Sequence, residues 1–287
     1  FLLAGSLARD GHPGRFLERR FHRLLPGLIV SLILAALVMG PAVSNLPLGT
    51  YLKDPGTWRY IAQNAVFGPL WADLPGVFDT NPYPAVAGSI WTLPYEVACY
   101  LGLLLAALGG ALSSRRSGCA VASALVLTYV GLAISGADAP LHPRLVNLHL
   151  LALPFFIGVV IGVWSDTLPR SPLLAAGLMG AAAAAQGTVF AEPTMALALI
   201  YVTLVLGLAR PGVLGGYNRL GDYSYGTYLY AFPVQGLMMH LAGPISPIQN
   251  IALALPVTLC LAALSWHLVE RPAMRLTVRR RRTQRTA

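Results

Sequence analysis

The stretch GSIWTLPYEVACYLGLLLAAL, residues 88–108, joins one carboxylate to an apolar run long enough to cross a bilayer. A transmembrane helix needs about 20 predominantly apolar residues, each adding 1.5 Å along the axis. If the helix starts near Gly88, Glu96 lies roughly 12 Å along it, and a later start at Pro94 makes it shallower. A charge there must be paired, hydrated or protonated. Glu96 is therefore either a proton-handling or substrate-binding carboxylate, or a structural one bonded to neighbouring helices.

Similar apolar runs fill most of the chain. Of its 287 residues, 56% are hydrophobic and 11% charged, and the mean hydropathy is +0.63, whereas soluble domains carry roughly 25% charged residues. We predict an all-α, polytopic transmembrane helical bundle, with eight full spans after a stub of a preceding helix at FLLAGSL, residues 1–7. The predicted spans are 24–44, 88–111, 117–135, 145–164, 171–190, 193–210, 222–243 and 247–269.

The basic residues give this bundle an orientation. All but three of the 20 Lys and Arg residues fall on one side of the alternating spans, and the exceptions are Lys53, Arg59 and Arg144. Because cytoplasmic loops carry the excess of basic residues, we expect residues 9–23 and the C-terminus in the cytoplasm and 45–87 outside. The net charge of +9 thus indicates a basic tail facing anionic lipid rather than nucleic-acid binding.

The chain has no sequence signal for a second domain or a metal centre. Residues 1–272 are predicted to form one membrane-embedded domain, and 273–287 a basic cytoplasmic tail. The cysteines lie in apolar stretches without metal-ligand or redox spacing, so we expect no disulfide and no metal; they are Cys99, Cys119 and Cys260. No pair of histidines has the spacing of a zinc site.

Three arginines precede the first full span, in FLERRFHRLLPGL. On a helix, Arg19 and Arg23 are i, i+4 neighbours, and Arg20 and Arg23 are i, i+3 neighbours, so the three share a face. Guanidinium groups match phosphate oxygens, which makes this face a candidate phosphate clamp. Ordinary anchoring by cytoplasmic positive charge is the alternative that charge alone favours.

The last two predicted spans carry polar residues near their ends. In LGDYSYGTYLYAFPVQ, residues 220–235, the tyrosines are interpreted as an aromatic belt at a membrane boundary; they are Tyr225, Tyr228 and Tyr230. In SWHLVERPAMRL, residues 265–276, Glu270 and Arg271 are interpreted mainly as a charge pair at the interface. The long segment 45–87 either covers an outward-facing site or is an ordered cap without a ligand role.

Five ordered blocks resemble the bacterial acyltransferase-3 family of membrane O-acyltransferases, in the form seen in exopolysaccharide acetyltransferases. The blocks are FLLAGSL, FLERRFHRLLP, GSIWTLPYEV, LGDYSYGTYLYAFPVQ and SWHLVERPAMRL. The resemblance runs nearly the length of the chain. It implies about ten helices in the complete protein, and FLLAGSL resembles the end of the second helix, so this chain would be truncated at its N-terminus.

The resemblance implies transfer of an acyl group, usually acetyl, from acyl-CoA to a hydroxyl of a glycan or glycosylated acceptor, such as a polysaccharide precursor. Glu96 would be the catalytic carboxylate, with Trp91 and Tyr95 of the same block expected to bind substrate. The arginines that would bind the CoA phosphates are Arg19, Arg20 and Arg23. The implied location is a bacterial cytoplasmic (inner) membrane, with the C-terminus cytoplasmic and acyl-CoA as the co-substrate.

One departure from the family bears on activity. The family's first helix carries a histidine, after a basic residue, that is regarded as the catalytic base, and no residue of 1–287 matches it. We therefore predict that residues 1–287 are inactive alone, which acetyl transfer by such a preparation would contradict. Direct transfer and an acyl-enzyme intermediate are both open. A transporter or flippase of a glycan or lipid precursor, or a non-catalytic membrane subunit, is the alternative, and dependence on acyl-CoA separates them.

Overall fold

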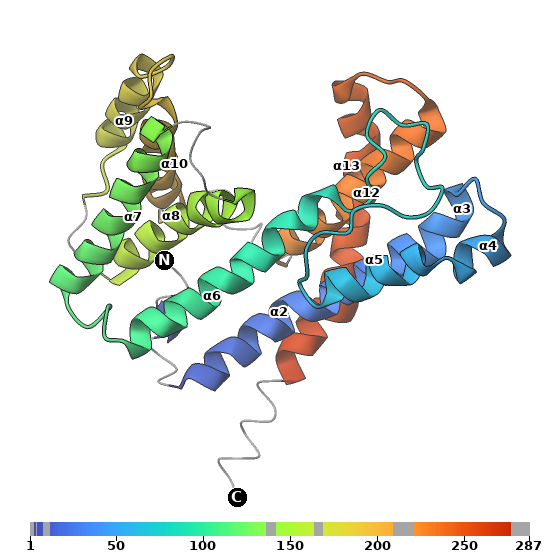
Figure 1. Ribbon diagram of the computed structural model, residues 1–287, viewed down its shortest axis with the longest axis horizontal. Coiled ribbons are helices and arrows are strands. Elements are labelled where there is room, and N and C mark those ends of the chain that lie inside the picture. The colour runs from blue at the N-terminus through green and yellow to red at the C-terminus, as the bar shows by residue number, and fades with distance from the viewer. Residues whose placement is uncertain are drawn as a thin grey trace, which may run out of the picture. The chain divides into compact units, whose positions relative to one another are not determined.

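The computed structural model describes residues 3, 5–7, 12–135, 142–163, 169–208 and 221–276. Apart from an isolated bridge between Ser44 and Val77, their regular structure is helical (Figure 1), which confirms the predicted all-α class for these residues. Of the predicted stub, residues 3 and 5–7 are helical, and the rest of 1–10 lies outside the described residues. The same holds for 277–287, most of the predicted basic tail.

A helix lies at each of the eight predicted spans. Among the described residues, four stretches are long and apolar enough to cross a membrane: Pro13–Val43, Gly88–Leu108, Pro143–Gly162 and Pro247–Leu276. Shorter apolar helices occupy Arg116–Gly131, Pro172–Ala184 and Ala191–Gly207, and α12 spans Ser224–Ala242. The chain is therefore a helical membrane protein, while the count of eight spans stays a prediction.

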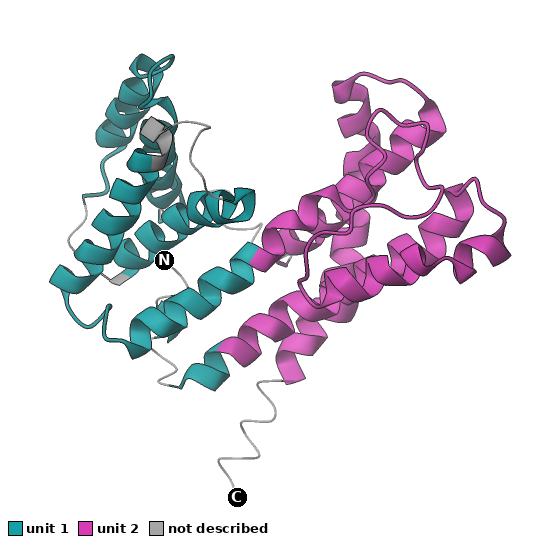
Figure 2. Ribbon diagram, viewed as in Figure 1, with its two compact units in different colours: residues 1–16, 95–212 teal, residues 17–94, 213–287 magenta. Residues whose placement is uncertain are grey.

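The chain divides into two compact units (Figure 2). The first comprises Phe1–Phe16 and Tyr95–Gly212, and the second Leu17–Pro94 and Val213–Ala287. Most of the first unit consists of helices α6 (Leu93–Leu108), α7 (Arg115–Ser135), α8 (Pro143–Val163), α9 (Pro172–Ala184) and α10 (Ala191–Gly207). The prediction of one domain over residues 1–272 remains a prediction, and each unit is described by itself.

Helices α12 and α13 (Pro247–Ser265) form the close-packed pair of the second unit. A Cβ atom built on Gly226 would lie 2.7 Å from the backbone Cα of Ala262, so only glycine permits this approach. The start of α13 is fixed by a capping box, in which the Ser246 side chain accepts a hydrogen bond from the Gln249 N–H and the Ser246 N–H donates one to the Gln249 side chain. Glycine therefore sets the separation of the two helices.

Helix α2 (Pro13–Leu34) continues into the π-helix η1 (Ala35–Met39) and the short α3 (Gly40–Val43). The Gly40 N–H bonds to the Ala35 carbonyl, and Pro41 has no N–H to offer the Ala36 carbonyl. The buried Tyr51 hydroxyl donates to that carbonyl instead, at 2.7 Å. This bond attaches the segment after α3 to the end of α2.

The segment 45–87, predicted to be outside, is ordered. It contains α4 (Leu48–Lys53) and α5 (Pro55–Ala65), whose N-cap is Asp54. Burial raises the pKa of Tyr51 to about 12, against a smaller lowering by a hydrogen bond with Thr57. The segment is thus ordered and packed on the second unit, and whether it covers an outward-facing site stays a prediction.

Candidate functional site

Glu96 lies at the start of α6, directly after the 3-10 helix η2 (Gly88–Thr92). The α-helix begins at Leu93, so Glu96 occupies its first turn and is shallower along the helix than a start at Gly88 would make it. Backbone N–H groups and the helix dipole favour a negative charge in this position. The half-buried Glu96 is therefore placed at the N-terminal end of α6.

The phenol of Tyr100 holds one oxygen of this carboxylate. One turn beyond Glu96, the Tyr100 hydroxyl donates a short hydrogen bond to Oε1, and no other described residue donates to Glu96. Tyr100 itself is 6% exposed, and its ring packs edge-on against Phe16 and at a tilt against Phe155, both at 6.3 Å between centroids. The arrangement fixes Oε1 and leaves Oε2 to accept a proton or a hydrogen bond from a ligand.

The block that carries Glu96 begins with η2, and η2 is bonded to α12. The Tyr228 hydroxyl donates to the Ser89 carbonyl at 2.7 Å and lies 2.9 Å from the Thr92 hydroxyl. The Ser89 hydroxyl donates in return to the Tyr228 carbonyl at 3.0 Å. These three bonds, which we call the η2 clamp, fix the turn that leads into α6.

The aromatic-belt interpretation of the α12 tyrosines is wrong. Tyr225 is buried and its hydroxyl donates to the Leu24 carbonyl at 2.9 Å, while Tyr228 forms the η2 clamp. Tyr230 is 5% exposed. All three side chains face other elements of the second unit, so they connect helices instead of lining a membrane boundary.

Arg23 lies between two carboxylates. Its Nη2 atom is 2.5 Å from Oδ2 of Asp222, and its Nη1 atom is 3.9 Å from Oε2 of Glu270. The guanidinium also lies 5.5 Å from the ring centroid of Trp266. Arg23, from the block FLERRFHRLLP, thereby contacts the blocks LGDYSYGTYLYAFPVQ and SWHLVERPAMRL within the second unit.

Glu270 is the most enclosed charged group of this cluster, with no exposed surface. It belongs to the π-helix η6 (Trp266–Glu270), whose wider turn brings residues five apart onto one face. The Ser265 hydroxyl accordingly donates to Glu270 Oε1 at 2.8 Å. The prediction of an interfacial pair with Arg271 is wrong, because Glu270 is buried and its nearest described cation is Arg23.

Asp222 stands just before α12 and is half exposed. Its Oδ1 accepts from the Ser224 hydroxyl at 2.6 Å and from the Ser224 N–H at 3.4 Å. Partial burial raises the pKa of Asp222, but the hydrogen bonds from Ser224 and the charge of Arg23 together bring that pKa below its usual value. Asp222 is therefore a charged carboxylate that pairs with Arg23.

The other predicted site residues lie on the elements expected of them. Arg19 and Arg20 are partly buried on α2, one turn before Arg23, and Nε and Nη2 of Arg19 are shielded from solvent. Trp91, on η2, is 39% exposed, and Tyr95, in the first turn of α6, is partly buried. Glu96 and Tyr95 belong to the first unit, whereas the arginines and Trp91 belong to the second.

Sequence reasoning missed the partners of these residues. Tyr100 carries a local signal, because it is four positions after Glu96 and so lies on the same helix face. The pair of Arg23 and Asp222 carries none, because 199 positions separate the two residues. Within the described residues, no three His, Cys, Asp or Glu side chains form a group that could hold a metal ion.

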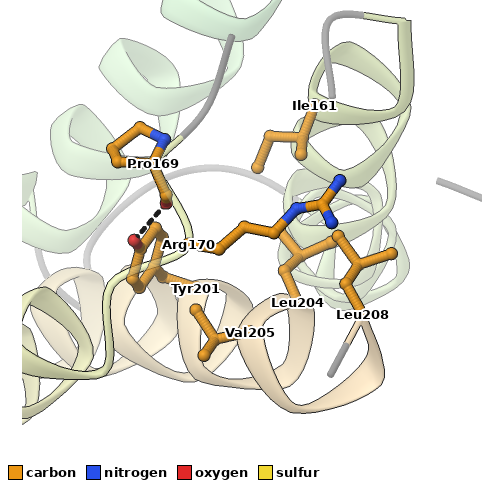
Figure 3. Close-up of a pocket in the computed structure, with 7 residues that line it drawn as sticks. All are labelled: Ile161, Pro169, Arg170, Tyr201, Leu204, Val205 and Leu208. Atoms are coloured by element: carbon orange, nitrogen blue, oxygen red, sulfur yellow. Dashed lines mark hydrogen bonds between the residues drawn. The ribbon is translucent and has the colours of Figure 1, made fainter. Parts of the chain in front are cut away.

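A pocket in the first unit is lined mainly by apolar side chains (Figure 3). Its floor is apolar, built from α8 and α10, and Arg170 is the one charged side chain among its described lining residues. The Tyr201 hydroxyl donates to the Pro169 carbonyl at 2.5 Å, which ties the start of the α9 segment to α10. The contact is a structural connection, and no carboxylate is among the described residues that line the pocket.

Comparisons with known proteins identify the family of the chain. Residues 1–267 match the model of a family described as an acyltransferase domain. A similar protein is an O-acetyl transferase of Shigella phage Sf6, which is 23% identical over 284 residues, covering 94% of this chain and 80% of the phage protein. No solved structure matches the chain.

Proposed function

The chain belongs to the acyltransferase-3 family, and from that membership we propose that this acyltransferase moves an acetyl group from acetyl-CoA to a hydroxyl of a glycan or glycosylated acceptor. The similarity to a phage O-acetyl transferase supports acetyl as the group and oxygen as the acceptor atom. The observation that carries the proposal is the Glu96 carboxylate, with Oε1 fixed by Tyr100 and Oε2 without a described donor. Family membership favours the enzyme over a transporter.

Glu96 is proposed to act on the proton of the acceptor hydroxyl. In direct transfer, the hydroxyl oxygen attacks the thioester carbon, the C–O bond forms and the C–S bond breaks, and the hydroxyl proton ends on the sulfur of CoA. Glu96 Oε2 would orient that hydroxyl or share its proton, because the Tyr100 phenol already occupies Oε1. In the alternative route, an acyl-enzyme intermediate forms first, and the same hydroxyl then attacks it.

The arginine face of α2 is proposed to bind the CoA phosphates. Arg19, Arg20 and Arg23 lie within about one helical turn, and guanidinium groups bind phosphate through charge-assisted hydrogen bonds. Asp222 and Glu270 orient Arg23 within this face. Trp91 and Tyr95, which flank Pro94 within five residues of Glu96, are proposed to contact the substrates.

The proposed location is the cytoplasmic membrane of a bacterium, with the arginine face and the C-terminus on the cytoplasmic side. Four helices long and apolar enough to span a membrane support a multi-pass protein. The concentration of basic residues on one predicted side supports the orientation. Acyl-CoA is made in the cytoplasm, so this orientation presents the arginines to the donor.

The test uses membranes that contain the protein expressed from its natural gene, and supplies them with acetyl-CoA labelled in its acetyl group. We expect label in the glycan or lipid fraction that depends on acetyl-CoA. The double substitution Arg19→Gln and Arg20→Gln should raise KM for acetyl-CoA by roughly tenfold or more, because each lost charge-assisted bond is worth about 1.5–3 kcal/mol.

Arg59→Gln is the matched control, because Arg59 stacks on Trp71 at 3.9 Å in the segment predicted to be outside. It should leave KM for acetyl-CoA unchanged. No labelled product from a broad set of acceptors would refute the proposed reaction. An equal rise in KM with Arg59→Gln would refute the assignment of the arginine face to the donor, and movement of an unmodified precursor would identify a transporter.

A further inference from the structure

A second cavity lies at the C-terminal half of α12, within the second unit. Its volume is about 300 Å³, at the lower end of the roughly 300–1,000 Å³ usual for small-ligand pockets. The loop 81–85, α12 and the first turn of α13 line it. Its polar side chains are mostly amides, and none of its described lining residues is charged; the residues used below are Asn81, Tyr83, Phe232, Gln235 and Asn250.

Asn250 gives this cavity an unsatisfied hydrogen-bond acceptor. The residue is 8% exposed, and its Nδ2 atom donates to the Gln235 carbonyl at 3.3 Å. Its buried Oδ1 atom accepts no hydrogen bond from any described residue. Because a buried polar atom without a partner is destabilising, a ligand that donates a hydrogen bond is favoured at this position.

The loop 81–85, which forms one wall of the cavity, is bonded to α12 at Gly236. The Asn81 side chain donates to the Gly236 carbonyl at 2.9 Å, and a Cβ on Gly236 would lie 2.6 Å from the ring of Phe78. Phe78 is fully buried and has a φ of 61°, a left-handed conformation that is costly for a bulky residue. The close packing of Phe78 against Gly236 thus positions the loop that carries Asn81 and Tyr83.

The chemistry of the lining selects the ligand. Amides both donate and accept hydrogen bonds, as hydroxyl groups require. The rings of Tyr83 and Phe232, edge-to-face at 5.8 Å, offer apolar surface for the C–H groups of a sugar ring. Phosphates and carboxylates are usually bound by arginine or lysine, and neither lines the cavity in the part of the chain that is described.

We propose that this cavity binds one uncharged sugar ring of the acceptor, with a ring hydroxyl donating to Asn250 Oδ1. The assignment of the ring to an acceptor rests on the proposed acetyl transfer. From Ser224 to Gly236 is twelve residues, or roughly 18 Å along α12. The sugar pocket and the cluster around Arg23 therefore lie toward opposite ends of one helix, which separates acceptor binding from the donor phosphates.

The test measures binding of methyl glycosides to the whole protein in lipid nanodiscs by saturation-transfer difference NMR. Neutral methyl hexosides should receive saturation from the protein, and methyl glucuronide should bind at least about tenfold more weakly, because no cation pairs its carboxylate. Asn250→Leu and Tyr83→Ala should each weaken hexoside binding about tenfold. Tyr83 is 63% exposed, so its variant tests the pocket even if Asn250→Leu does not fold.

Trp58→Ala is the matched control, because Trp58 is a 51% exposed aromatic residue on α5 and does not line the cavity. It should leave hexoside binding unchanged. Three outcomes would overturn the pocket: no hexoside bound, glucuronide bound as tightly as hexosides, or Tyr83→Ala without effect.

The same variants separate this inference from the proposed reaction. If hexosides bind through Tyr83 but no acetyl group is transferred to any acceptor, the pocket stands and the proposed reaction fails. If acetyl transfer occurs and KM for the acceptor is unchanged in Tyr83→Ala and Asn250→Leu, the reaction stands and the pocket is refuted. KM for acetyl-CoA should stay unchanged in both variants.

Discussion

Replacing Arg23 by leucine removes the one described cation within 4 Å of the buried Glu270 carboxylate. At the observed 3.9 Å, two unit charges attract by about 4 kcal/mol at an effective dielectric constant of about 20. The contact of Arg23 with the half-exposed Asp222 adds only about 0–1 kcal/mol. We expect Arg23→Leu to lower the free energy of unfolding by about 3 kcal/mol, as breaking a buried ion pair does.

Glu270→Gln should be far milder and should rescue the first substitution. Glutamine removes the charge but keeps an oxygen for the Ser265 hydroxyl, which now bonds at 2.8 Å, so we expect a loss of about 1 kcal/mol. In the double variant, no uncompensated carboxylate remains. We therefore expect the double variant to be about 1–2 kcal/mol more stable than Arg23→Leu alone.

Titration with SDS in mixed micelles, followed by circular dichroism and tryptophan fluorescence, measures these unfolding free energies. The three variants and the wild type form a double-mutant cycle. If the double variant loses the full sum of the two single losses, Arg23 and Glu270 act independently. That result would refute the reasoning that Arg23 compensates a buried charge.

Three further changes test separate parts of the second unit. Gly226→Ala should destabilise the protein by about 1–3 kcal/mol in the same titration, because its Cβ would lie 2.7 Å from the backbone of Ala262. Tyr228→Phe removes the hydroxyl bonded to the Ser89 carbonyl and should cost about 1 kcal/mol and lower acetyl transfer by loosening the start of α6. The pKa of Asp222 is lower in the folded than in the unfolded protein. Its contribution to the free energy of unfolding is therefore present above about pH 4 and is lost as the pH falls through the folded pKa. Melting temperatures from pH 7 to 3 should therefore fall less steeply for Asp222→Asn.

Matched changes control these measurements. Gly177→Ala, on α9, places a Cβ where nothing lies within 4 Å, so it should not destabilise the protein as Gly226→Ala does. Asp79→Asn, at an exposed carboxylate that accepts a hydrogen bond from Asn45, controls for the loss of one negative charge at the surface. If a control changed the stability as much as the substitution it is matched with, the role given to Gly226 or to Asp222 would be contradicted. A Tyr228→Phe variant with wild-type stability would show that the two bonds of the Tyr228 hydroxyl in the η2 clamp contribute nothing to stability.

Apolar runs predicted the positions of the helices well, but not their ends. The predicted first span begins at residue 24, whereas α2 begins at Pro13, because its first three turns are basic and do not register as apolar. The predicted start at Gly88 is a 3-10 turn, and the α-helix begins at Leu93. Pro94 lacks an N–H and fits the first turn of a helix, which explains the later start.

The candidate site was predicted as residue types on helices, without the long-range contacts that arrange them. Composition placed the α12 tyrosines at a boundary, yet Tyr225 and Tyr228 bond to backbone carbonyls of other elements. Hydropathy likewise placed Glu270 at an interface, although the π-turn at its position buries it beside Ser265. Such partners depend on tertiary packing, which local periodicity does not contain.

The measurement closest to the central claim compares acetyl transfer by the wild type and by Glu96→Gln in membranes with equal amounts of each protein, expressed from the natural gene. Glutamine keeps the size of the side chain and an oxygen for the Tyr100 hydroxyl, but it cannot accept the acceptor's proton. We predict that kcat falls by about 10²–10⁴-fold while KM for acetyl-CoA stays within about twofold. An unchanged rate of transfer would remove Glu96 from the chemistry and contradict the account.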